Sequence, residues 1–151
     1  MLTAIIVIVL MSTVAILIMD MSGKLVKETT SQYQSEQAAL YANSFTEYAI
    51  MAVTANNRAV KCLNTITSNI GPNPADGRGY NITVTISYIG DNATLGGAVV
   101  CANELSTAVT TASTPLSIIV DVYVRYKELD HQAGSVNAPF TTFHRRTIQK
   151  I

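Results

Sequence analysis

The sequence of 151 residues lacks tryptophan, has only two cysteines and four prolines, and is poor in charged side chains, which make up 13% of it. Ten lysines and arginines balance ten aspartates and glutamates, so there is no basic excess to bind the phosphates of a nucleic acid. The 48% of residues that are hydrophobic exclude general disorder, because such a chain can bury enough surface to fold. The sequence therefore predicts one folded domain without a nucleic-acid partner.

Charge is absent altogether from residues 1–19, whose only polar side chains are Thr3, Ser12 and Thr13. At 1.5 Å per residue a helix of this length measures about 28 Å, close to the hydrocarbon thickness of a bilayer. A helix satisfies its own backbone in lipid, and the three hydroxyls can donate to carbonyl groups one turn earlier. We therefore predict a transmembrane half of the helix over residues 1–22 and a globular domain over residues 23–151.

This apolar segment differs from a cleaved secretory signal, because it has no basic start and residues 19–22 form a poor cleavage site. We expect the segment to be retained. Lys24 and Lys27 follow it and, by the positive-inside rule, favour a cytoplasmic domain. The two cysteines favour an exported domain, and we adopt this second orientation.

Helix-forming residues continue beyond the apolar segment, since residues 21–70 contain no proline and a single glycine, Gly23, where a bend is expected. Apolar residues recur at helical spacing, which predicts an amphipathic helix ending at Gly71, with a break allowed at residues 54–57. The predicted apolar face, in which Gln37 is an exception, is Tyr33, Gln37, Tyr41, Phe45, Tyr48, Ala52, Ala59, Leu63, Ile66 and Ile70. The predicted polar face is Lys27, Gln34, Glu36, Asn43, Glu47, Asn57, Arg58 and Lys61.

The second half alternates apolar and polar side chains, which is typical of strands with one solvated face. Residues 80–89 and 117–127 predict two strands, residues 140–151 a more polar edge strand, and residues 105–112 a weaker fourth. The side chains expected on the solvated face of the second strand are Asp121, Tyr123, Arg125 and Lys127. We predict an α+β fold, in which a long N-terminal helix, apolar then amphipathic, covers a small three- to four-stranded antiparallel sheet.

Side chains that could carry out catalysis or hold a metal are few. His131 and His144 lie thirteen residues apart without metal-binding spacing, and a solvated edge strand explains His144 more simply. Asp91 and Asn92 suit a β-turn better than a Ca²⁺ site. Phosphate-binding, dinucleotide-binding and nucleophile-elbow motifs are absent. We therefore expect neither an enzyme nor a cofactor.

The two cysteines are Cys62, near the end of the predicted helix, and Cys101, between predicted strands. Two separated cysteines in an exported domain pair more often than not, and two buried free thiols are the alternative. A disulfide would close a loop of about forty residues and tie the helix to the sheet.

The layout resembles that of the type IV pilin-like proteins, most of all a pseudopilin or minor pilin of a type II secretion or type IV pilus system. The likeness in sequence lies in residues 1–19, which read MLTAIIVIVLMSTVAILIM, while the likeness in architecture covers the whole chain. The basic leader of the family, which ends in glycine, is absent, and so is its glutamate at the fifth mature position. That position is Ile5 if Met1 is the first mature residue, which suits a minor or tip subunit. If Met1 is the sixth, the glutamate lies upstream.

The resemblance implies a subunit with a single span in the bacterial inner membrane, a periplasmic C-terminal domain and methylation of the processed N-terminus. Its partners would be the lipid bilayer, an ATP-driven inner-membrane assembly machinery and other pilin-like subunits, with which it would form a periplasmic or surface filament for protein transport. The stem residues expected at the packing surface, where small side chains let helices approach closely, are Ala4, Ile5, Ile8, Ser12, Ala15 and Met19. A single-pass membrane-anchored periplasmic sensor or binding domain is the alternative function.

Overall fold

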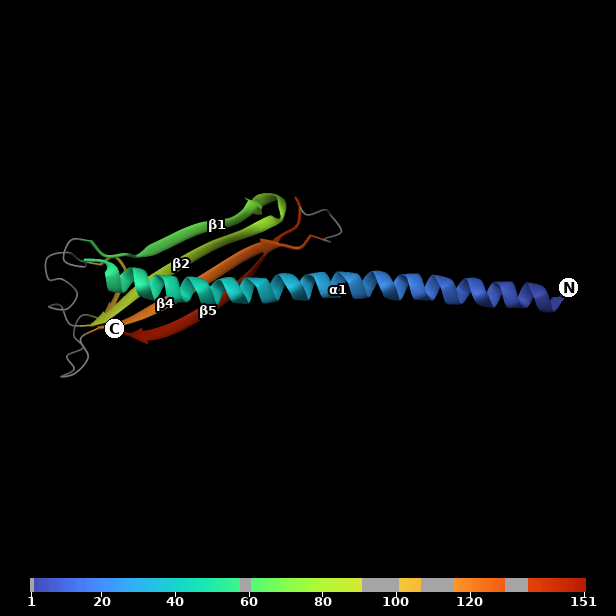
Figure 1. Ribbon diagram of the computed structural model, residues 1–151, viewed down its shortest axis with the longest axis horizontal. Coiled ribbons are helices and arrows are strands. Elements are labelled where there is room, and N and C mark those ends of the chain that lie inside the picture. Colours follow the sequence, from blue (N-terminus) through green and yellow to red (C-terminus); the bar gives the residue numbers. More distant parts are fainter. Residues whose placement is uncertain (1, 58–60, 91–100, 107–115, 130–135) are drawn as a thin grey trace.

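The computed structural model describes residues 2–57, 61–90, 101–106, 116–129 and 136–151. In chain order the elements are α1 (Leu2–Ala55), β1 (Thr65–Asn73), the 3-10 turn η1 (Pro74–Asp76), β2 (Arg78–Gly90), β3 (Glu104–Ser106), β4 (Leu116–Lys127) and β5 (Phe140–Lys150). The sheet lies against the C-terminal half of α1, and the N-terminal half extends far beyond it (Figure 1). The predicted α+β arrangement of one long N-terminal helix on an antiparallel sheet is confirmed.

The helix α1 runs unbroken for 54 residues, so the predicted long N-terminal helix is confirmed, but its predicted continuation to Ile70 is wrong. Helical structure ends at Ala55, inside the predicted break, and the chain resumes as strand β1. Ile66 and Ile70 are half-buried on β1. Residues four apart share a face in a strand as well as in a helix, so their spacing fits both structures. Ala59 and Arg58 lie outside the described residues.

Gly71 does not cap a helix but lies within β1, near its C-terminal end, where its φ is +94°. The pairing of the two strands shifts register between Ile70 and Asn73. Gly79, the second residue of β2, has φ +150°, and a Cβ on it would overlap the carbonyl oxygen of Ile70 on β1. Only glycine combines these backbone angles with so close an approach of two strands.

The sheet has the order β1-β2-β4-β5, with all three neighbouring pairs antiparallel, and the short β3 pairs with β2 in parallel. The strands predicted at residues 80–89, 117–127 and 140–151 are confirmed as β2, β4 and β5, and β5 is an edge strand as expected. The weaker fourth strand, predicted over residues 105–112, overlaps the short β3, which ends at Ser106. The rest of that prediction falls on residues 107–115, which lie outside the described residues.

One face of the sheet carries the core and is covered by α1, which packs on β4, β5 and β2 (Figure 1). Apolar side chains of β2 and β4 are fully buried there: Ile82, Val84, Ile86, Tyr88, Ile118, Val120, Val122 and Val124. Small side chains of α1 face them, also fully buried: Ala38, Ala42, Ala49 and Val53. The core is thus formed by a β-branched surface against an alanine-lined helix.

The face of α1 that packs on the sheet is shifted by about one residue along the sequence from the predicted face. Tyr33 and Tyr48, predicted to face the sheet, are 62% and 52% exposed, whereas Gln34, predicted to be solvated, is 6% exposed. The amide nitrogen Nε2 of Gln34 donates to the carbonyl oxygen of Lys127 at 3.2 Å. Alanine lets the helix backbone approach the sheet more closely than tyrosine does, and hydrophobicity alone does not reveal this preference.

Three tyrosine rings in contact, those of Tyr41, Tyr80 and Tyr126, hold α1 against the sheet close to Gln34. The ring of Tyr80 lies 5.0 Å from that of Tyr41 on the helix and 5.6 Å from that of Tyr126 on β4. The Tyr80 hydroxyl donates to the backbone oxygen of Gln34 at 3.4 Å. Burial, together with the neighbouring tyrosines, raises the pKa of Tyr80 to about 12, so the ring is neutral at physiological pH.

Candidate functional surfaces

The N-terminal half of α1 is the first candidate surface, because nothing in the described chain packs against it. By length and composition this helix could be a membrane anchor or a signal sequence, and none of its most apolar window is buried. The hydroxyls of Ser12 and Thr13 donate to the carbonyl oxygens of Val9 and Leu10, each at 2.8 Å, as predicted. Such bonds remove the cost of placing these hydroxyls in lipid.

All the stem residues predicted to pack against other subunits are exposed, namely Ala4, Ile5, Ile8, Ser12, Ala15 and Met19. The exposed fractions of Ile5, Ile8 and Met19 are 62%, 68% and 77%. Their role in packing stays a prediction. The helix is continuous through Gly23, and apart from the adjoining residues and the local helix backbone no heavy atom lies within 4 Å of the place where a Cβ would stand. A functional bend at Gly23 likewise stays a prediction.

A second apolar surface, not predicted from the sequence, follows α1 beyond the stem on the side away from the sheet. We call it the outer stripe, and its members are Val26, Tyr33, Leu40, Tyr48 and Met51. Their exposed fractions lie between 52% and 63%. Tyr33 and Met51 are eighteen residues apart, which is five turns at 3.6 residues per turn, and the others lie within about 60° of the line joining them. The outer stripe therefore follows one side of α1, with polar residues such as Gln37, Ser44 and Glu47 between its apolar members.

The outer stripe is collinear with part of the predicted packing surface of the stem. At 100° per residue, Ala4, Ile8, Ala15 and Met19 fall within about 40° of the line through Tyr33 and Met51. The fully buried alanines that face the sheet lie on the opposite side of α1. One side of α1 thus binds its own sheet, and the other side presents apolar residues along nearly the whole helix.

The predicted pairing of Cys62 with Cys101 is confirmed. The two residues form a disulfide with a Cα–Cα distance of 5.3 Å, and their exposed fractions are 5% and 1%. Because α1 ends before Cys62, the disulfide joins the connection between α1 and β1 to the chain before β3, rather than the helix to the sheet. It fixes the end of the molecule farthest from the stem.

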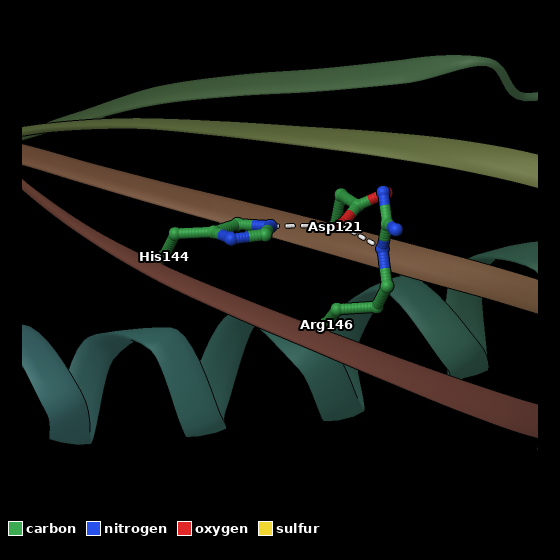
Figure 2. Close-up of polar contacts among 3 residues, drawn as sticks. All are labelled: Asp121, His144 and Arg146. Carbon is green, nitrogen blue, oxygen red and sulfur yellow. Dashed lines mark hydrogen bonds and ion pairs between the residues drawn. The ribbon is translucent and has the colours of Figure 1, made fainter.

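A polar cluster lies on the face of the sheet that α1 does not cover (Figure 2). Asp121 on β4 was predicted to be solvated but is only 6% exposed. Arg146 on β5, its direct partner in the register, donates from Nε to Oδ1 at 2.7 Å and from Nη2 to Oδ2 at 2.9 Å. His144 Nε2 lies 2.8 Å from Oδ1, and its ring stacks on Tyr123 at 4.5 Å. These side chains cover Asp121 and exclude water from it.

The charged side chains of this cluster attract one another across the two strands. The hydrogen bonds from Arg146, and to a smaller extent those from His144, hold the pKa of Asp121 below its ordinary value. The carboxylate in turn raises the pKa of Arg146. Within the described residues, the side chains that hydrogen-bond to Asp121 are those of Arg146 and His144, and neither carries a hydroxyl or thiol. The cluster therefore holds the edge strand β5 to β4.

Within the described residues, no group of three or more His, Cys, Asp or Glu side chains is placed to hold a metal ion. His131, Asp91 and Asn92, considered from the sequence, lie outside these residues. Comparisons with protein-family models, curated proteins and solved structures found no match to this chain. The exposed apolar surfaces of the stem and the outer stripe are therefore the candidate functional surfaces.

Proposed function

We propose that this chain is a structural subunit, a pseudopilin or minor pilin, of a type II secretion or type IV pilus-like filament, anchored in the bacterial inner membrane before assembly. The observation that carries the proposal is the continuity of the stem with the outer stripe. An anchor needs apolar residues only across the bilayer, about 20 residues. Leu40, Tyr48 and Met51 lie well beyond that length and still expose large apolar side chains. Exposed apolar surface of this extent is typical of protein contacts.

The shape of the molecule supports the same proposal. A helix of 54 residues is about 81 Å long, so about 50 Å remains beyond a 30 Å hydrocarbon core. The sheet covers one side of only the C-terminal part of that remainder (Figure 1), and the outer stripe stays open for the helix of another subunit. On leaving the bilayer, the stem would exchange lipid for protein contacts at little hydrophobic cost, because both are similarly apolar. The disulfide suits a periplasmic domain, since disulfides persist in oxidising compartments.

The proposal is tested by placing a charge on the outer stripe. Leu40→Glu in the full-length chain should leave membrane insertion unchanged but reduce crosslinked and filamentous species about tenfold or more, since burial of a leucine is lost and a carboxylate is desolvated. The matched control is Gln32→Glu, which adds the same charge at an exposed position of α1 outside the outer stripe. Insertion is measured by membrane fractionation, and assembly by crosslinking and by shearing of filaments from cells that lack the wild-type chain.

The result also separates the filament subunit from an anchored sensor or binding domain. A sensor needs α1 only as an anchor and a spacer, so Leu40→Glu and Gln32→Glu should behave alike. Equal assembly of these two variants and the wild-type chain would refute the filament proposal.

A further inference from the structure

Both edges of the sheet lack a strand partner within the described part of the chain. The order β1-β2-β4-β5 places β1 and β5 at opposite borders of the sheet (Figure 1). Strand β5 pairs with β4 in one unbroken register over its 11 residues, so its outer edge is long and regular. Such an edge offers a row of free N–H and C=O groups to another strand.

The backbone hydrogen bonds next to these strands show which residues turn those groups outward. The N–H of Ile86 donates to the oxygen of Asn64 at 2.9 Å, and the N–H of Ile151 donates to the oxygen of Leu116 at 3.0 Å. Residues of an antiparallel pair alternate between bonded and non-bonded positions. By this alternation, the residues of β1 whose backbone groups point outward are Thr65, Thr67 and Asn69. Those of β5 are Phe140, Thr142, His144, Arg146, Ile148 and Lys150.

The outward-turned residues of both edges place their side chains on the same face of the sheet. It is the face that α1 leaves uncovered, where the cluster around Asp121 lies (Figure 2). Strands β1 and β5 also run in opposite directions, because three antiparallel pairings separate them. A second copy displaced sideways without rotation therefore brings its β1 against β5 as an antiparallel pair, with α1 on the same face in both copies.

Membrane anchoring, on which the proposed function rests, gives all copies this common direction, because their stems enter the bilayer from one side. The strands run roughly along α1 (Figure 1). Pairing β5 with a second β5 requires a twofold rotation that reverses the strands, and it would point the two stems in opposite directions. The same holds for two copies of β1, so only β5 with β1 fits subunits in one membrane.

The charges of the two edges favour the same pairing. Strand β5 carries Arg145, Arg146 and Lys150, so two copies of β5 would repel each other. Strands β1 and β3 follow one another along the opposite edge, and Glu104 is the one charged residue in them. Glu104 has no ion pair within the described residues. In the register of the sheet it lies level with Gln149, next to Lys150.

We propose that β5 of one copy pairs with β1 of the next, so that the sheets of neighbouring subunits become continuous. The contact is heterologous, because each copy contributes one edge of each kind, and it can therefore extend from copy to copy. Four strands about 4.8 Å apart set such copies about 19 Å apart, which exceeds the distance of about 8 to 10 Å between packed helices. At the level of the sheet, the edge contact and the outer stripe thus join different pairs of subunits.

The test is disulfide crosslinking between two differently tagged copies of the full-length chain, in membranes and in sheared filaments. One copy carries Asn69→Cys, and the other carries Phe140→Cys, Thr142→Cys or His144→Cys, which sample three registers. The Cα atoms of a bonded antiparallel pair lie about 5.5 Å apart, which suits a disulfide. One of the three should crosslink to Asn69→Cys. The control Thr83→Cys, on the same face of the inner strand β2, should not.

Thr67→Pro in the copy with Asn69→Cys supplies a second measurement. The N–H of Thr67 points away from β2, and proline is tolerated at such positions of an edge strand. The circular dichroism spectrum should therefore stay unchanged. The crosslinking yield should fall about fivefold, the effect expected of one lost hydrogen bond.

Several outcomes would overturn the edge contact. They are an equal yield with Thr83→Cys, an unchanged yield in folded Thr67→Pro, and crosslinking of Thr142→Cys only to Thr142→Cys of another copy. Filaments that form without any crosslink between β1 and β5 would also overturn it and leave the filament proposal standing. Edge crosslinks in membranes from a chain that forms no filament would support the contact and refute the filament. A chain that yields neither would refute both.

Discussion

Asp121 holds the edge strand β5 to β4 through two side chains that reach it from different positions along β5. Arg146 stands directly opposite in the register, and His144 reaches the same carboxylate from the position opposite Tyr123. Alternation correctly placed Asp121 on the face that lacks the helix, but it gave no sign of the burial. That burial comes from cross-strand neighbours more than twenty residues away, which a local pattern does not contain.

Asp121→Asn should lower the free energy of unfolding by about 1 kcal/mol at pH 7, a value reduced because Arg146 and His144 reach into water. The folded-state pKa of Asp121 is lowered, so its carboxylate stabilises the fold above the unfolded-state pKa of about 3.9. This contribution is lost as the pH falls through the folded-state pKa. Urea unfolding of the full chain in mild detergent at pH 7 and pH 3 measures it, and the stability difference between the two proteins should be smaller at pH 3 than at pH 7.

The control for this experiment is Glu47→Gln, which neutralises an exposed carboxylate on α1. It should unfold like the wild-type chain at both pH values. A stability difference between wild type and Asp121→Asn that is the same at pH 3 and pH 7 would contradict the role given to the carboxylate.

The disulfide between Cys62 and Cys101 acts on the unfolded chain, because it closes a loop with a sequence separation of 39 residues. In the chain-entropy account such a loop contributes about 4 kcal/mol. The double substitution Cys62→Ser and Cys101→Ser should therefore lower the free energy of unfolding by about 3 to 4 kcal/mol, measured by urea unfolding under non-reducing conditions. Addition of a reductant should shift the wild-type chain toward the double variant and leave that variant unchanged.

At the scale of elements, the strands could be predicted where one face is buried and the other is exposed to solvent, because apolar and polar side chains then alternate. In β2 the alternation of side chains follows burial residue by residue, and in β4 it does so except at Asp121 and Lys127, which were predicted to be solvated but are buried. Both strands were therefore found with nearly their observed bounds. Strand β1 was missed because Ile66 and Ile70 keep a spacing of four, which a helix and a strand share. Its neighbours Thr65 and Thr67 favour a strand, but only the pairing with β2 decides between the two structures.

The orientation of α1 was not predictable for a different reason. Both flanks of the helix carry apolar residues between Tyr33 and Val53, and the flank with smaller side chains binds the sheet. The hydrophobic pattern selected the larger residues, Tyr33 and Tyr48, and this error also hid the outer stripe. Deciding between the flanks requires the shape of the sheet, which a single sequence does not display. The candidate disulfide, in contrast, needed only the cysteine count and the expected compartment.

Gly23→Ala tests whether flexibility of α1 is used in assembly. Alanine meets no steric obstacle there and should stabilise the helix by up to about 1 kcal/mol, seen as a higher midpoint of thermal unfolding by circular dichroism. If a bend at Gly23 is needed when the subunit leaves the membrane, insertion should persist while filament incorporation falls. Gly79→Ala is the comparison, because the same substitution at the start of β2, where φ is +150° and Ile70 lies close, should destabilise the fold.

At the scale of the whole molecule, the filament proposal requires one helix to contact lipid first and other subunits later, while it also packs on its own sheet. Its first third is bare in the free subunit, its last third is covered on one side by the sheet, and the outer stripe continues along the uncovered side. A free subunit in water would expose all of this apolar surface. In the proposed function, the bilayer and later the neighbouring helices would cover this surface.

The final prediction separates an anchor from a packing element by shuffling residues 2–19 at constant composition. A pure anchor depends on hydrophobicity and length, so the shuffled chain should insert and function normally. A packing surface depends on the order of shapes, because small residues such as Ala4, Ser12 and Ala15 allow close approach of neighbouring helices. In the filament proposal, alkaline extraction should show unchanged insertion, while incorporation into filaments should fall at least as far as for Leu40→Glu. Survival of both insertion and incorporation would make the stem a generic anchor and leave only the outer stripe to support assembly.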